Sequence, residues 1–135
     1  MNYIIESLLV GIYTCIIYLL FSSFIKNLYL LLLVVGVFKH LFGSSIGLHT
    51  WYCNNGETCL KLLDKSQTYI ANTLYIISDS IYESIVFLIL GFILSYILTN
   101  MYLFFAIGII LHILSEKLGV HKNFCRSSCD KIQTN

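Results

Sequence analysis

Long apolar runs separated by short polar stretches divide the chain into four segments. Residues 7–25 carry no charged side chain, residues 28–38 are entirely apolar, and two further runs occupy residues 84–98 and 101–114. A helix needs roughly 20 residues to cross a bilayer, at about 1.5 Å per residue. The first run reaches this length alone, and the others reach it with their flanking polar residues. Because the runs are continuous and do not alternate, we expect transmembrane helices and not a β-barrel.

The composition also indicates a membrane protein of one domain. Hydrophobic residues make up 58% of the chain, charged residues only 11%, and the mean hydropathy is +0.82, whereas soluble domains carry about 25% charged residues. The net charge of +1 and the lack of a basic stripe argue against nucleic acid as a partner. Glu6 stands where a signal peptide has basic residues, so we expect the first helix to remain in the mature protein. The expected partner is the lipid bilayer.

Two stretches of the sequence recur in the same order, which indicates a duplicated helical hairpin. IIESLLV at 4–10 matches IYESIVF at 81–87, and Gly-x-His-x-x-x-Cys occurs as GLHTWYC at 47–53 and as GVHKNFC at 119–125. Five identities share an offset of 72 residues: Gly36, His40, Gly47, His49 and Cys53 fall on Gly108, His112, Gly119, His121 and Cys125. Because each unit crosses the membrane twice, both keep one orientation and form parallel repeats about a pseudo-two-fold axis.

These patterns predict an all-α fold, a four-helix transmembrane bundle. In segment 54–80, apolar residues recur at helical spacing, which predicts an amphipathic helix lying at the membrane interface between the repeats. The predicted domains are a first repeat at 1–53 with spans at about 4–25 and 27–43, the interfacial segment at 54–80, a second repeat at 81–125 with spans at about 81–98 and 101–116, and a polar tail at 126–135.

The basic residues predict the orientation of the bundle. Seven of the eight lie on the side of the termini and of the middle segment, and only Lys26 lies on the side of the hairpin turns. By the positive-inside rule, both termini are expected in the cytoplasm.

Histidine and cysteine near the ends of the two repeats are candidate metal ligands. His49 and Cys53 are four residues apart, as are His121 and Cys125, so on a helix each pair shares one face. If the two segments converge, these four residues form a Cys2His2 set of the kind that binds zinc. A reducing cytoplasm would keep the thiols free for the metal.

The cysteines also allow a different interpretation, in which this side of the bundle faces a lumen. Cys59 follows Cys53 by six residues and Cys129 follows Cys125 by four, so two local disulfides, Cys53–Cys59 and Cys125–Cys129, would staple the ends of the bundle. Cys15, within the first helix, is interpreted as a small packing residue.

Four ionisable residues near or within the apolar runs are candidates for an ion or proton path: Glu6, His40, Glu83 and His112. Such groups are expensive in a bilayer and face the bundle interior. A simpler interpretation has neutral imidazoles bonded to a neighbouring helix and carboxylates stabilised at helix N-termini. If instead the carboxylates face His40 and His112, the pairs would support proton transfer or cation binding.

The proline-free, Ile-, Asn- and Tyr-rich sequence, with KHLFGSSIGLHTWYCNNG and LHILSEKLGVHKNFC, resembles small uncharacterised multi-pass membrane proteins of nucleocytoplasmic large DNA viruses. The two stretches cover about a quarter of the chain. The resemblance implies a host-derived or virion inner membrane as the location and membrane or capsid assembly as the role. It supplies no catalytic residues.

The sequence contains no G-x-S-x-G, Gly-rich phosphate loop, H-E-x-x-H or potassium-filter motif. We therefore expect a non-enzymatic membrane scaffold or assembly protein with a candidate His/Cys zinc site, acting as a homo-oligomer or with other membrane or capsid proteins. One alternative is a small proton or metal-cation channel or transporter. Another is a membrane thiol–disulfide oxidoreductase, although neither cysteine pair is C-x-x-C.

Overall fold

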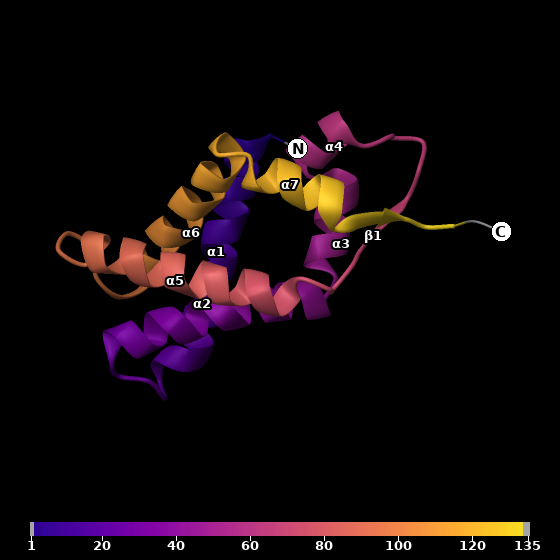
Figure 1. Cartoon of the computed structure of the whole chain (residues 1–135). Coiled ribbons are helices and arrows are strands. Elements are labelled where there is room, and N and C mark those ends of the chain that lie inside the picture. The colour runs from indigo at the N-terminus through magenta and orange to yellow at the C-terminus, as the bar shows by residue number, and fades with distance from the viewer. Residues whose placement is uncertain (1, 134–135) are drawn as a thin grey trace.

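The computed structural model describes residues 2–133 and is predominantly helical (Figure 1). Four helices have the length and apolar composition needed to cross a membrane: α1 (Tyr3–Ser22), α2 (Leu28–Ser45), α5 (Ile76–Leu94) and α6 (Asn100–Lys117). The predicted all-α fold and four-helix bundle are confirmed. Met1, in the predicted first repeat, and residues 134–135, in the predicted tail, lie outside the described residues.

The four long helices pack in pairs that join the two halves of the chain. α1 packs mainly against α6, and α2 mainly against α5 (Figure 1). Glycines permit two close approaches: a Cβ at Gly108 would lie 2.5 Å from Thr14 Oγ1, and one at Gly36 would lie 2.7 Å from Ser84 Cα. Small residues at such crossings are typical of helix packing in membranes. The crossed pairing therefore follows from the positions of these small residues.

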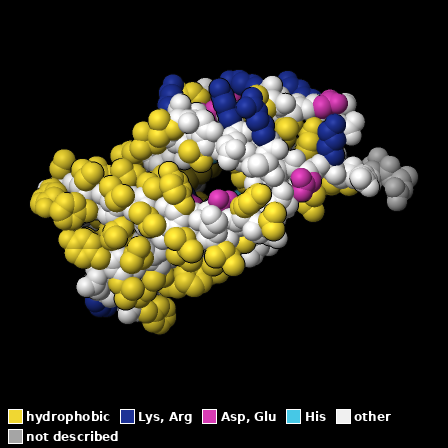
Figure 2. Space-filling model, viewed as in Figure 1, with side chains coloured by type: hydrophobic (Ala, Val, Ile, Leu, Met, Phe, Trp, Pro, Cys, Tyr) yellow, Lys and Arg dark blue, Asp and Glu magenta, His cyan; other side chains and the backbone are white. Residues whose placement is uncertain are grey.

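The interior of the bundle is filled by large apolar side chains. The buried core consists of Ile17, Leu31, Leu32, Val35, Phe87, Leu103, Phe104 and Ile107. In the space-filling view, apolar side chains cover the surface of the long helices, and most Lys and Arg side chains gather at the other part of the molecule (Figure 2). The outer apolar surface suits lipid, and the charged part suits water or headgroups.

A smaller folded unit, here called the cap, covers one end of the bundle. It contains three short helices, α3 (Leu48–Asn55), α4 (Glu57–Leu62) and α7 (Val120–Ser127), and the antiparallel strands β1 (Tyr69–Ala71) and β2 (Cys129–Lys131). The chain leaves α2 through Gly47 at φ 84° and leaves α6 through Gly119 at φ 80°. This left-handed backbone favours glycine, so both glycines turn the chain from a long helix into the cap.

The predicted interfacial helix at 54–80 is wrong. The segment holds α4, then β1, and α5 begins at Ile76, five residues before the predicted span. Tertiary hydrogen bonds hold β1 extended: the Asn54 side chain bonds the backbone N–H and carbonyl of Tyr69, and Thr50 Oγ1 accepts from the Ala71 N–H. Pairing with β2 adds to these bonds, so tertiary contacts override the helical spacing.

Candidate functional site

Ionisable side chains gather in two clusters where the long helices meet the cap. The lysine cluster comprises Lys39 and His40 of α2, His49 of α3 and Glu83 of α5. The carboxylate cluster comprises Glu6 of α1, His112 and Glu116 of α6, and His121 of α7. Each cluster therefore takes two histidines from one half of the chain and one glutamate from the other.

In the lysine cluster, Glu83 is the common partner of two side chains. Lys39 Nζ donates to Glu83 Oε1, and His40 Nδ1 lies 2.9 Å from Glu83 Oε2. The His49 ring packs against His40 with 4.5 Å between ring centroids. Burial, with the neighbouring His40 adding to it, lowers the pKa of His49 to about 4. His49 is therefore neutral near pH 7.

In the carboxylate cluster, Glu6 is almost completely buried and holds His112. Glu6 Oε2 lies 3.3 Å from His112 Nε2, and Glu6 Oε1 accepts a 2.7 Å hydrogen bond from the Glu57 N–H at the start of α4. Glu6 is 3% exposed and His112 is 8% exposed. The Tyr3 N–H also donates to the Glu57 carboxylate, so the N-terminus of α1 and the cap are joined through Glu6 and Glu57.

The second carboxylate of this cluster, Glu116, holds His121. His121 Nδ1 lies 2.8 Å from Glu116 Oε2, and the Thr58 hydroxyl donates to Glu116 Oε1. The His121 and His112 rings lie 4.5 Å apart between centroids. Burial lowers the pKa of His121.

The two clusters differ in charge. In the lysine cluster, the ammonium of Lys39 balances the carboxylate of Glu83. In the carboxylate cluster, neither Glu6 nor Glu116 forms an ion pair with a lysine or arginine of residues 2–133. Burying a charge without an opposite charge is costly. The carboxylate cluster therefore has an excess of negative charge unless a histidine or a carboxyl group is protonated.

Aromatic rings from the cap connect the clusters. Tyr52 lies 5.2 Å from His121, Phe124 lies 5.7 Å from His49, and Tyr52 and Phe124 lie 5.9 Å apart, each measured between ring centroids. The Tyr52 hydroxyl is buried and finds no hydrogen-bond partner among the described residues. Burial, followed by the charges of Glu6 and Glu116, raises the pKa of Tyr52.

The four cap cysteines form two disulfides that cross between the halves of the chain. Cys53 of α3 pairs with Cys129 of β2, and Cys59 of α4 pairs with Cys125 of α7. The predicted local disulfides, Cys53–Cys59 and Cys125–Cys129, are wrong. The antiparallel strands and the packing of α4 against α7 bring each cysteine to a partner from the other half. The remaining cysteine, Cys15, is free, in agreement with a packing role.

The predicted Cys2His2 zinc set of His49, Cys53, His121 and Cys125 is not formed. Both of its cysteines are in disulfides, and a metal requires a thiolate. Its histidines lie in different clusters, each beside a carboxylate-bonded histidine. The predicted shared site is therefore wrong, and each histidine lies instead in one of the two clusters.

The predicted carboxylate–imidazole pairs are formed. Glu83 bonds His40, and Glu6 bonds His112, in each case across the two halves of the chain. Sequence reasoning missed the role of Glu116. The signal was present, because His112 and Glu116 are one helical turn apart and so share a face of α6.

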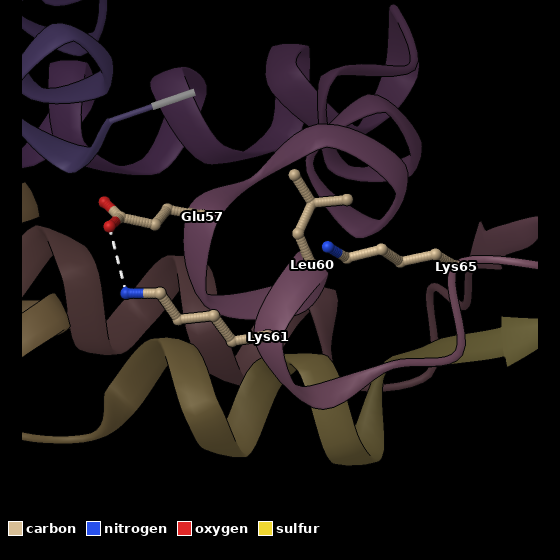
Figure 3. Close-up of a pocket in the computed structure, with 4 residues that line it drawn as sticks. All are labelled: Glu57, Leu60, Lys61 and Lys65. Atoms are coloured by element: carbon tan, nitrogen blue, oxygen red, sulfur yellow. Dashed lines mark hydrogen bonds and ion pairs between the residues drawn. The ribbon is translucent and has the colours of Figure 1, made fainter.

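The surface of the cap has an open hollow beside the start of α4. It is lined by Glu57, Leu60, Lys61 and Lys65, and Figure 3 shows Glu57 and Lys61 pointing toward one another, with 3.0 Å between Lys61 Nζ and Glu57 Oε1. An exposed pair of this kind within one helical turn is typical of a solvated helix surface. The hollow therefore lacks the convergent polar groups of a ligand site.

Fold and clusters together define a four-helix protein whose long helices could cross a membrane, with a disulfide-bonded cap over a largely buried His/Glu layer. Comparison with protein-family models, with curated proteins and with solved structures gives no match for this chain.

Proposed function

We propose that this chain is a non-enzymatic membrane scaffold whose cap offers a rigid surface to other proteins at the bilayer. The observation that carries the proposal is the crossed pair of disulfides, Cys53–Cys129 and Cys59–Cys125, with separations of 76 and 66 residues along the chain. They tie the segment after α2 to the segment after α6. Such cross-links favour one fixed arrangement of the cap, which suits assembly more than a moving catalytic or transport element.

We propose that the cap faces an oxidising compartment. Buried structural disulfides persist in secreted, lumenal or extracellular locations and are rare in a reducing cytoplasm. The positive-inside rule favours the opposite orientation, but a count of basic residues biases insertion without excluding it. Cysteines introduced at Ser22 or Thr99, at the hairpin turns, should then be labelled by a membrane-impermeant reagent only from the cytoplasmic side. Labelling from the opposite side would contradict this proposal and place the cap in the cytoplasm.

The partners that we propose are further copies of this chain or other membrane or capsid proteins. The resemblance to small multi-pass proteins of large DNA viruses supports a role in membrane or capsid assembly. To test scaffolding, the protein is extracted from its producing membrane in mild detergent and its mass is measured. We expect an assembly larger than one chain for wild type and a smaller one for C53S/C129S, with C15S as the matched control. A single chain in the wild-type extract would contradict the proposal.

Cation or proton transport is the second candidate, because the carboxylate–imidazole pairs of a proton path are formed. The apolar core argues against it. Leu32, Val35, Phe87, Phe104 and Ile107 are 0% exposed and occupy the bundle interior on the way to the hairpin turns. A path through one chain would have to cross this dry layer, where a charge is expensive.

The transport candidate is tested in sealed vesicles that carry a pH-sensitive dye. We expect the same proton leak for wild-type protein and for H40Q/H112Q. A wild-type flux that H40Q/H112Q abolishes would replace the scaffold with a transporter. The thiol-redox alternative is weaker still, because the paired cysteines are at most 8% exposed, and a thiol-exchange enzyme needs an accessible sulfur.

A further inference from the structure

The carboxylate cluster has the charge of a cation site. Glu6 is almost completely buried and the side chain of Glu116 is 14% exposed, so two carboxylates lie in this layer. Their hydrogen bonds come from the Glu57 N–H, the Thr58 hydroxyl and two imidazoles. None of these donors carries a fixed positive charge, so a bound cation would supply the missing charge.

The geometry of the cluster supplies three metal ligands. One ligand atom each of His112, Glu116 and His121 can be chosen so that all three lie within 4.8 Å of one another. Metal bonds of 2.0–2.2 Å in a tetrahedral site place ligand atoms about 3.4 Å apart. Small rotations of the three side chains would bring the ligand atoms to this spacing. His112 and Glu116 already share one face of α6.

We propose that His112, Glu116 and His121 bind one divalent transition-metal ion of the zinc type. Imidazole ligands favour zinc and its neighbours over magnesium or calcium, which prefer oxygen ligands alone. Glu6 gives His112 the carboxylate hydrogen bond that commonly orients a metal-bound histidine. The three protein ligands leave a fourth position for water. The Tyr52 ring lies 5.2 Å from the His121 ring between centroids, and its hydroxyl has no hydrogen-bond partner among the described residues, so it could bond such a water.

The lysine cluster is the matched negative control within the same chain. It also contains two histidines and a carboxylate, but the ammonium of Lys39 is bonded to Glu83 and supplies the positive charge. At the 72-residue offset, Leu111 corresponds to Lys39, and Glu116 corresponds to Ser44. One half therefore carries an internal cation, and the other half carries an extra carboxylate. We expect one metal ion per chain, not two.

The test uses the full-length protein in detergent with its disulfides intact, stripped with a chelator and titrated with Zn²⁺ or Co²⁺. We expect one ion per chain and visible Co²⁺ bands of a tetrahedral site, without the thiolate charge-transfer band that a cysteine ligand would give. E116Q and H121N should weaken binding at least 100-fold, and E6Q about 10–100-fold. H49N and H40Q, from the lysine cluster, should bind as wild type does.

Three outcomes would overturn the site. They are the absence of stoichiometric binding by folded wild-type protein, equal loss in the H49N and E116Q variants, and a thiolate band in the Co²⁺ spectrum. Circular dichroism and the count of free thiols establish that each variant is folded, and E116Q retains an oxygen that can accept from Thr58. Should E116Q not fold, H121N alone decides, because His121 lies on α7, outside the bundle. The scaffold proposal is tested by assembly mass and is independent of this result.

Discussion

The lysine cluster and the carboxylate cluster contain similar residues, but the negative charge of their carboxylates is compensated in different ways. Glu83 is balanced by Lys39 from the facing helix, so the lysine cluster is complete as the chain folds. Glu6 and Glu116 are held by neutral donors and imidazoles and have no lysine or arginine partner in the described part of the chain. One half of a similar layer is therefore neutralised within the chain, and the other half leaves two carboxylates without a lysine or arginine partner among the described residues.

Removal of Lys39 is the change with the largest expected effect on this comparison. In K39M, Glu83 stays buried with only His40 as a partner, which should cost about 4 kcal/mol of unfolding free energy. Unfolding is measured by SDS titration in mixed micelles. The double variant K39M/E83Q should recover most of the loss. Equal stability of K39M and wild type would show that Glu83 does not need Lys39 to compensate its charge. The two clusters would then not differ in the way described above.

The disulfides should have the next largest effect, and an unequal one. Cys59–Cys125 fixes α7, which carries His121, whereas Cys53–Cys129 fixes α3, which carries His49. Each double serine variant should lose roughly 3 kcal/mol of stability. Metal affinity should fall more in C59S/C125S than in C53S/C129S, as measured by Co²⁺ titration. Equal affinities would indicate that α7 is positioned without its disulfide.

Metal should change the effect of one substitution. Without metal, E116Q removes a partly exposed negative charge but also weakens the bonds of Glu116 with Thr58 and His121, so its stability should differ little from that of wild type. With free Zn²⁺ at about 100 times the dissociation constant, wild type should gain about 2.7 kcal/mol and E116Q almost nothing. E83Q, in the lysine cluster, should lose stability with and without zinc. A wild-type protein that zinc does not stabilise would contradict the assignment of a metal to the carboxylate cluster.

The main features of the bundle could be predicted from the sequence because they depend on patterns along the chain. Continuous apolar runs locate the four long helices, and the recurrence of Glu and His in both halves indicated carboxylate–imidazole pairs, without indicating which glutamate meets which histidine. Both halves also have two long helices followed by a left-handed glycine and a short helix. The duplication itself stays a prediction.

The cap could not be predicted in the same way, because its contacts join residues far apart in sequence. The spacing of Cys53, Cys59, Cys125 and Cys129 allows three pairings and contains no information about which sulfurs meet. The strand β1 depends on side-chain bonds from α3 and on pairing with β2. Helical spacing in the middle segment therefore gave a wrong prediction, and the zinc set that depended on free thiols failed with it.

The smallest expected effect is a loss of stability in mild acid that depends on His49. Its pKa is about 4 in the folded protein and about 6.5 when unfolded. Between these values the unfolded chain binds more protons, so stability falls as the pH falls from 7 towards 4.

The groups that face His49 are His40, Glu83 and Lys39, and comparison with H49N removes their separate contributions. Between pH 7 and pH 5, wild type should lose about 2 kcal/mol more than H49N. An identical pH dependence of unfolding for both proteins would show that the ring of His49 is not held neutral by burial, and the lysine cluster would then be open to water.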